Sequence, residues 1–281
     1  MKIALITDST ADLPPVLAAE LGVTVVALTV QFGGRSFPDG TGPTVPEMLL
    51  AAQAGAALPK TSQPTPAAFA EAFERRLKRA DHVICPTISS TLSGTYGSAV
   101  QAALGFGGRV TVIDSRISSG AQGLMVERAA RALGDGASLA ELNALFERLR
   151  RIVSIHFTVA TLEFLRKNGR IGAAAALLGG LLSIKPMLEY HDGVMNAVGR
   201  PRGAKRALQD TVAGVRDYVA RYGPSRAWFI YSQAPADVQA LREACLDLDV
   251  TEARSAQVGA VIASHVGPHA YGVCLEPINL P

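Results

Sequence analysis

The sequence predicts an α/β fold in which a mainly parallel sheet is followed by a second α/β unit. One observation behind this prediction is the alternation, through the first half of the chain, of short apolar runs with longer amphipathic segments. Strands and crossover helices of a parallel sheet produce that pattern, because such strands are buried on both faces. The other is composition: 48% of the 281 residues are hydrophobic and 18% are charged, which supports a large core and excludes general disorder.

The N-terminal unit begins with a short buried strand that ends at Asp8. Proline is tolerated in a first helical turn, so Pro14-Pro15 predicts the next helix, and Thr44-x-x-Glu47 is the capping box of another. Gly33-Gly34 predicts a hairpin turn. In chain order we expect strand 2–7, helix 14–21, strand 23–30, helices from residues 45 and 66, strand 82–86, helix 92–104, strand 110–113 and helices 119–133 and 138–150.

The C-terminal unit again mixes strands and helices. Asn168-Gly169 ends a short helix, and Asp192-Gly193 is typical of a tight turn between two strands. We expect strand 152–159, helix 161–169, two strands within 183–198, helix 204–221, strand 227–231, helix 235–245 and strands 250–254 and 271–276. No repeat or linker marks the division, and we place it so that the domains are residues 1–151 and 152–281.

Charge, cysteine content and hydropathy exclude several classes of protein. The formal charge is +3, from 27 basic and 24 acidic residues, with no basic block, so nucleic-acid binding is not expected. The three cysteines have no metal-binding spacing, and we interpret them as buried residues in a reducing compartment. The longest apolar run, residues 171–184, is too short for a membrane span and predicts a buried helix. With no export signal visible, we expect a cytoplasmic protein without stable membrane insertion.

Hydroxyl side chains gather near the predicted carboxyl ends of the parallel strands, where ligands bind in open α/β sheets. Residues 7–10 and 89–95 each follow a predicted strand, and Thr61-Ser62 lies between two predicted helices. Ser93-Gly94 falls at a helix start, where free backbone N–H groups favour an anion. The alternative is that these residues are ordinary helix caps and turn residues. Their clustering at several strand ends favours the anion site.

Motifs of several common enzyme classes are missing from the sequence. There is no P-loop, no GxGxxG after a strand, and no GxSxG, since the residue two before Ser93 is Thr91. The five histidines include no HExxH pair, so no metal site is expected. His265 lies just ahead of the last predicted strand, where it is either a ligand-binding residue at a strand-end site or a packed side chain.

Seven stretches spread along the chain match one protein family. They are TDSTADLP (7–14), PKTSQPTP (59–66), ISSTLSGTYGSA (88–99), TLEFLRKNGRIG (161–172), LLSIKP with the following DG (181–193), GRPRG (199–203) and SHVGPHAYGV (264–273). In content and order they resemble the DegV family, the bacterial fatty-acid-binding proteins that serve a fatty acid kinase. The last stretch reads HVGPH where the family usually has HTGPG, and RKNGRIG replaces KKGGRIG but keeps Arg170.

The resemblance implies a two-domain α/β fold with a Rossmann-like sheet domain, in which a long-chain fatty acid such as palmitate or oleate lies between the domains. It also implies that a separate kinase converts the bound carboxyl group to an acyl phosphate. The protein itself would then need no cofactor and perform no turnover. The family's carboxyl contacts fall on Thr61, Ser93 and His265, and we add their neighbours Ser62 and Gly94.

Two arginines in the matching stretches, Arg170 and Arg202, are expected to face the kinase. The alternative is that they belong to an ordinary solvated surface. The apolar run 171–184 is expected either to line the tunnel for the fatty acid tail or only to pack in the core.

The runner-up function is a hydrolase or acyltransferase. In that reading Ser93 is the nucleophile, His265 is the base, and Asp8 or Asp114 orients the imidazole. The missing GxSxG context argues against it.

Overall fold

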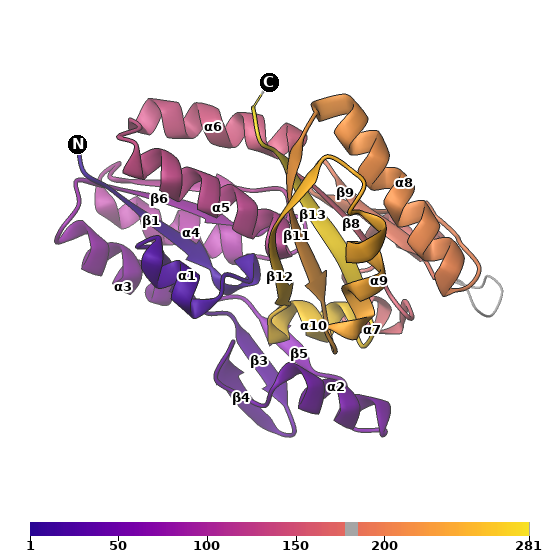
Figure 1. The fold of residues 1–281 in the computed structure, drawn as a ribbon. Coiled ribbons are helices and arrows are strands. Elements are labelled where there is room, and N and C mark those ends of the chain that lie inside the picture. The colour runs from indigo at the N-terminus through magenta and orange to yellow at the C-terminus, as the bar shows by residue number, and fades with distance from the viewer. Residues whose placement is uncertain (178–184, 281) are drawn as a thin grey trace.

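The computed structural model describes residues 1–177 and 185–280, and it places two main sheets beside each other with a small third sheet at one end (Figure 1). The first main sheet has four parallel strands in the order β2-β1-β6-β7. Their bounds, in that order, are Thr24–Val26, Ile3–Asp8, His82–Thr87 and Val110–Asp114. The parallel sheet predicted from the alternating apolar runs is therefore confirmed.

The second main sheet is mixed, with six strands in the order β10-β9-β8-β13-β11-β12. β11 and β12 run parallel, and the other neighbouring pairs are antiparallel. Strands β8 to β13 span Ser154–Thr158, Met187–His191, Val194–Gly199, Ser225–Tyr231, Val250–Gln257 and Tyr271–Pro277. The chain enters this sheet close to residue 151, and the domain boundary placed there stays a prediction.

The small third sheet divides a segment that was expected to be a single strand. It consists of β3, β4 and β5, which span Thr29–Phe32, Arg35–Pro38 and Lys60–Ser62. The predicted strand 23–30 is therefore wrong in extent. The Ser9 hydroxyl accepts the Leu28 N–H at 3.1 Å, and the chain leaves the parallel sheet there. The hairpin predicted at Gly33-Gly34 joins β3 to β4 and is confirmed.

Helices cover the outer faces of both main sheets and fill the layer between them (Figure 1). α3 and α4 pack on the parallel sheet, α8 and α9 pack on the mixed sheet, and α5 contacts strands of both. Helices α1 to α10 span Pro15–Glu20, Val45–Gln53, Pro66–Leu77, Thr95–Ala103, Ser119–Gly134, Leu139–Ile152, Glu163–Lys167, Ala204–Tyr222, Ala236–Ala244 and Ala260–Val266. Thr44 and Glu47 form the predicted capping box of α2, whereas the short α10 was not predicted.

The predicted buried helix over residues 171–184 is wrong where the structure describes it. Gly172–Leu177 form a short 3-10 helix, η3, in which Ala174 and Leu177 are the buried residues. Gly172 has a φ of +54°, and a Cβ there would lie 2.7 Å from the carbonyl oxygen of Met195 on β10. The left-handed φ of Gly172 interrupts a regular α-helical path at that residue. The rest of the run, residues 178–184, lies outside the described residues.

Helix α5 packs between the two main sheets and contacts strands of both. Residues 119–127 of this helix are buried, and Gly120 and Gly123 face the Trp228 ring of β11. A Cβ at position 123 would lie 2.6 Å from that ring and from the Ala11 carbonyl oxygen, so the contact requires glycine. As a result, one hydrophobic core runs through both sheets.

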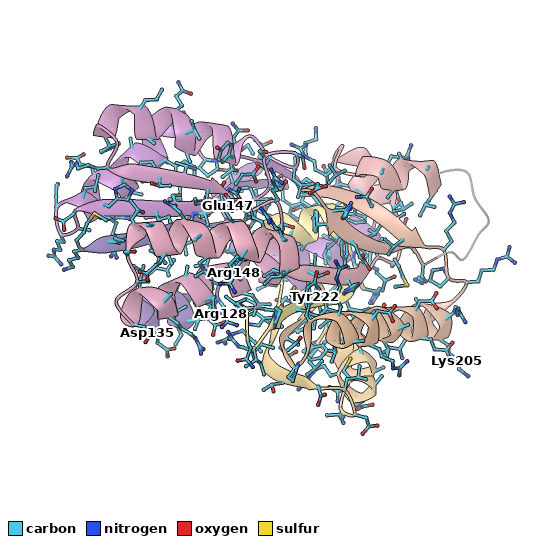
Figure 2. All side chains as sticks on the ribbon, turned by 90° about the horizontal axis from the view of Figure 1, so that it is seen from above. Arg128, Asp135, Glu147, Arg148, Lys205 and Tyr222 are labelled. Carbon is cyan, nitrogen blue, oxygen red and sulfur yellow. The ribbon has the colours of Figure 1, made fainter. Side chains whose placement is uncertain are left out.

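Ion pairs with buried carboxylates connect α5 to the mixed sheet. Nε of Arg128 lies 2.6 Å from Glu276 on β13, and Nη2 of Arg226 lies 2.7 Å from Glu127. In the view from above, Arg128 lies beside the C-terminal strands (Figure 2). A buried charge left without its partner is strongly destabilising, so these contacts favour a single arrangement of helix and sheet.

The three cysteines, Cys85, Cys245 and Cys274, are buried as predicted. Burial raises the pKa of the Cys245 thiol to about 11. Within the described ranges, no helix is long and apolar enough to cross a membrane. The same residues contain no group of three or more His, Cys, Asp or Glu side chains that would hold a metal ion.

Candidate functional site

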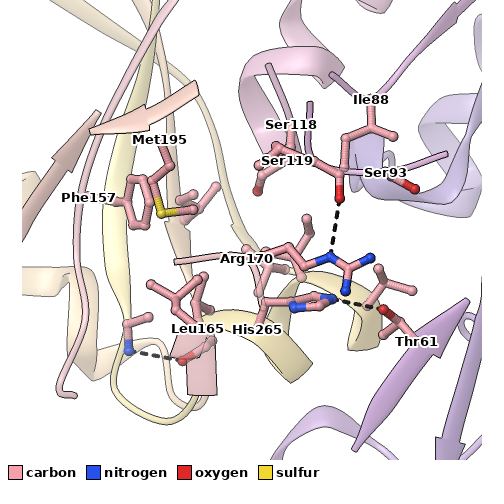
Figure 3. Close-up of a pocket in the computed structure, with 18 of the residues that line it drawn as sticks. Thr61, Ile88, Ser93, Ser118, Ser119, Phe157, Leu165, Arg170, Met195 and His265 are labelled. Atoms are coloured by element: carbon pink, nitrogen blue, oxygen red, sulfur yellow. Dashed lines mark hydrogen bonds between the residues drawn. The ribbon is translucent and has the colours of Figure 1, made fainter. Parts of the chain in front are cut away.

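A cavity of about 360 Å³ lies between the two main sheets, at the carboxyl ends of the parallel strands (Figure 3). Ile88 and Ser93 reach it from the loop after β6, and Ser118 and Ser119 reach it from the segment after β7. The sequence predicted a site at this edge of the sheet. The volume falls within the range of about 300–1,000 Å³ that is usual for small-molecule sites.

Most of the cavity wall is apolar. The mixed sheet and the neighbouring helices supply Ile155, Phe157, Met195, Leu165 and Val261. Figure 3 shows Phe157 and Met195 across the cavity from the hydroxyls of Thr61 and Ser93. The site therefore has an apolar side and a polar side.

Thr61 and His265 meet on the polar side. Oγ1 of Thr61, on β5, lies 2.8 Å from Nε2 of His265, in the last turn of α10, although 204 positions separate the two residues. Asn168 holds the two backbones together, because its Nδ2 donates to the carbonyl oxygens of Ser264 at 2.8 Å and Pro59 at 3.2 Å. The side-chain pair is thus fixed by a second link between the same segments.

The imidazole of His265 is neutral near pH 7. Burial lowers its pKa to about 4, and the nearby Arg170 guanidinium acts in the same direction. Its second ring nitrogen, Nδ1, is buried and has no hydrogen-bond partner among the described residues. An anionic or neutral oxygen in the cavity would therefore meet an uncharged ring rather than an imidazolium.

Ser93 and Ser62 line the same cavity, whereas Gly94 does not. Gly94 lines an adjoining groove of about 490 Å³, which shares Ser93 and Arg170 with the cavity. The Ser93 hydroxyl also accepts the N–H of Thr95 at 3.3 Å, at the start of α4. Ser93 therefore borders the cavity and also bonds to the first residue of the helix, and its role in binding an anion stays a prediction.

The two predicted partner-facing arginines lie in different places. Arg170 is exposed at the edge of both the cavity and the groove, where it donates to the carbonyl oxygens of Asn168 at 2.8 Å and Leu92 at 3.2 Å. Arg202 is exposed just ahead of α8 and is not among the described residues that line either space. Lys205, in the first turn of α8, points away from the body of the molecule (Figure 2).

Two polar features of the site were not predicted. Gln63 lines the cavity, and the missing side chain of Gly94 makes room for it, since a Cβ there would lie 2.1 Å from Oε1 of Gln63. The Ser118 hydroxyl and the Tyr190 hydroxyl, 2.9 Å apart, also face the cavity. Gln63 lies in the family-matching stretch PKTSQPTP, and this was the one feature of the sequence that could have indicated its place in the site.

The geometry of a catalytic triad is not found among the described residues. Ser93 bonds to Thr95 and His265 bonds to Thr61, so the proposed nucleophile and base do not meet. Asp8 accepts the N–H of Ile88 at 2.7 Å and does not contact His265. Asp114 instead accepts bonds from Ser90 and Arg116. This disfavours the hydrolase reading.

Comparison with known proteins agrees with this fold. A model of the DegV family, described as uncharacterised proteins, matches residues 2–277. A DegV domain-containing protein of Deinococcus radiodurans is 45% identical, with 99% of this chain and 100% of that protein covered. The chain therefore belongs to the DegV family.

Solved structures show the same architecture. One, described as fatty acid binding of a DegV family protein from Thermus thermophilus, has a TM-score of 0.96 and 45% identity, covering 99% of this chain and 100% of that one. A stearic acid-binding protein from Eubacterium ventriosum has a TM-score of 0.89 and 26% identity, covering 97% of each chain. The two-domain α/β class expected from the resemblance is thereby confirmed at the level of the fold.

The low pKa of His265 is directly measurable. In an NMR titration of the histidine rings, the His265 resonances should move near pH 4 rather than near the usual 6.5. Since the folded pKa lies below the unfolded one, the neutral ring contributes stability above about pH 6.5 that is lost as the pH falls through 4. Arg170→Ala should raise this pKa, and Arg79→Ala, at an exposed site after α3, should leave it unchanged. A His265 pKa near 6.5 would contradict the described burial.

Proposed function

We propose that the protein binds one long-chain fatty acid, such as palmitate or oleate, in the cavity between the sheets. The tail lies against the apolar wall, and the carboxyl group meets Thr61, Ser93 and His265, with Ser62 beside them. The observation that carries this proposal is the Thr61–His265 hydrogen bond of 2.8 Å on the polar side of an otherwise apolar cavity. The relatives described as fatty-acid-binding proteins support it.

The energetics fit a ligand with a long apolar tail. Burying about 14 methylene groups at about 0.8 kcal/mol each contributes about 11 kcal/mol before the costs of association. The tail can therefore supply most of the affinity, and the head group needs only to be oriented. Hydroxyls and an uncharged imidazole do this without the tight hold of a bidentate arginine clamp.

We also propose that the bound carboxyl group is presented to a separate kinase. A carboxylate oxygen forms a bond to the phosphorus of the kinase's phosphoryl donor as the donor's leaving group departs, which yields an acyl phosphate. The protein of this proposal performs no turnover of its own. It acts in lipid metabolism in the cytoplasm, as one subunit of a kinase system, with the fatty acid held between the unit of residues 1–151 and that of residues 152–281.

The kinase is proposed to approach the side of the cavity that Arg170 borders. Arg170 is exposed and also touches the groove next to the polar side, so a partner that reached the carboxyl group would pass it. Arg202, exposed just ahead of α8, is proposed as a second contact for the kinase. Exposed charges of this kind mainly raise the rate of association.

The head-group assignment is tested by removing hydroxyls. Thr61→Val and Ser93→Ala should each raise the dissociation constant for palmitate about fivefold, the equivalent of one neutral hydrogen bond of about 1 kcal/mol. Phosphorylation by a partner kinase should suffer more than binding, because transfer needs an oriented carboxyl group. Thr41→Val, at an exposed turn, is the matched control. Normal phosphorylation of the double variant would show that these residues are only caps.

The partner surface is tested with the two arginines. Arg170→Ala and Arg202→Ala should keep their bound fatty acid but slow kinase-dependent phosphorylation, whereas Arg79→Ala should do neither. The wild-type rate should fall as salt rises, because screening weakens exposed charge pairs. An arginine variant that instead lost its lipid, with no separate kinase defect, would assign that arginine to the pocket or the fold.

A further inference from the structure

Two carboxylates from the start of the chain cap the short helix that carries His265. Oδ1 of Asp12 accepts the N–H of Gly259 at 2.8 Å, and Oδ1 of Asp39 accepts the N–H of Ala260 at 3.1 Å. These N–H groups belong to the start of α10, where a helix has no internal acceptors for them. Both bonds therefore tie α10 to the N-terminal half of the chain.

Helix α10 is also a wall of the cavity. Val261, Ile262, His265 and Val266 all line the cavity, so one short helix supplies part of the apolar wall and part of the polar side. A helix of seven residues is too short to be stable alone. The two acids at its start, the Asn168–Ser264 bond and the Thr61–His265 bond near its end help to hold it in place, together with its packing on the neighbouring elements.

Asp12 is connected to the cavity by a second route. The Ser119 hydroxyl donates to Oδ2 of Asp12 at 2.6 Å, and Ser119 itself lines the cavity. Asp12 and Ser119 have φ values of 51° and 60°, in the left-handed region that side chains other than glycine rarely adopt. Such conformations persist where the surroundings enforce them, and they gather at functional sites.

The charges around Asp12 oppose its ionisation. Burial, with smaller contributions from the charges of Asp39 and Asp8, raises the pKa of Asp12 to about 8. Burial likewise raises the pKa of Asp39 and of Asp8. Cys274 also faces Asp12, and burial keeps its thiol pKa well above 9. At the far end of the helix His265 is neutral, and the charge nearest to it is the Arg170 guanidinium, which lowers the pKa of His265.

We propose that Asp12 is a positioning residue that, together with Asp39, holds α10 and thereby places His265 for the carboxyl group of the ligand, and that rising pH weakens this hold. The identity of the ligand rests on the proposed function, whereas the coupling between the acids and the helix does not.

The direction of the pH effect follows from linkage. We call the arrangement closed when α10 is bonded to Asp12, as in the structure, and open when α10 has moved away and water reaches Asp12. The pKa of Asp12 is about 8 in the closed arrangement and returns toward the ordinary 3.8 in the open one. The closed arrangement binds the proton more tightly, so it loses stability relative to the open one as pH rises from about 4 to about 8. Above that range the loss is complete.

The first experiment compares two ligands that differ only in the head group, palmitate and hexadecanol. Asp12→Ala should raise the dissociation constant for palmitate about fivefold or more and that for hexadecanol by a clearly smaller factor, because α10 gives apolar wall to both ligands but only palmitate presents a carboxyl group to His265. Asp12→Asn should restore palmitate binding, because its amide oxygen still accepts from Gly259 and its NH₂ group can donate to Ser119. Asp135→Ala, at the exposed end of α5, is the matched control.

The second experiment needs no ligand. Hydrogen exchange of the Gly259–Val261 amides, corrected for intrinsic rates, should show protection that falls between about pH 4 and 8, by up to about tenfold per pH unit for each acid that titrates. The fall should be shallower in Asp12→Asn, since one of the titrating groups is gone. Circular dichroism confirms that each variant is folded.

The outcomes separate the two proposals. If wild-type protein binds palmitate but Asp12→Ala binds it equally well, or loses palmitate and hexadecanol alike, the positioning role is overturned. If wild-type protein binds no palmitate, the proposed function fails, and the exchange profiles alone decide the coupling. Identical profiles for wild type and Asp12→Asn would overturn that coupling as well.

Discussion

The packing of one helix between two sheets is the constraint on which the rest of this structure depends. α5 reaches the Trp228 ring closely because Gly120 and Gly123 present no side chain to it, and a Cβ at Gly123 would clash with both halves of the chain. The ion pairs from Arg128 and Arg226 add a polar connection at the same layer. With the two sheets held by a common helix, the loops at their edges must meet, and they enclose the cavity at the start of α5, where Ser118 and Ser119 line it.

The polarity of that cavity follows from which segments converge on it. Strands and helices of the C-terminal half bring apolar side chains, because these residues belong to the hydrophobic core that runs through both sheets. The loops of the parallel sheet and β5 bring hydroxyls. His265 and Tyr190 are polar residues from the C-terminal half, and His265 reaches the polar side because α10 is fastened at both ends. The neutral imidazole suits an oriented but loosely held carboxyl group.

Local patterns predicted the elements whose signal lies within a few residues. The capping box at Thr44 and Glu47 and the turns at Gly33-Gly34 and Asp192-Gly193 act within four residues, and the structure contains them. The strand 23–30 was wrong because the break at Leu28 depends on the Ser9 hydroxyl, a contact between segments that no local pattern contains. The helix predicted from residue 171 was wrong at its first described turn, where Gly172 has a left-handed φ and its backbone lies close to Met195 of β10, a neighbour that no local pattern contains.

Periodicity and residue spacing predict less of the candidate site than of the fold. Thr61 and His265 were paired in advance by family resemblance, because no spacing rule connects residues 204 positions apart. α10 has seven residues, too few to establish a helical pattern of apolar residues. Its capping acids, Asp12 and Asp39, come from the opposite end of the chain. Gly94 is predicted to contact the carboxyl group only because it follows Ser93 in the sequence, and in the structure it lines the neighbouring groove.

The central claim is that the cavity holds one fatty acid. Native mass spectrometry of the protein purified from a bacterial host measures this most directly, because it weighs the chain with its ligand. The account predicts an added mass that corresponds to about one long-chain fatty acid per chain, released by solvent extraction and restored by palmitate or oleate. A preparation that carries no lipid and takes up neither added fatty acid would contradict it.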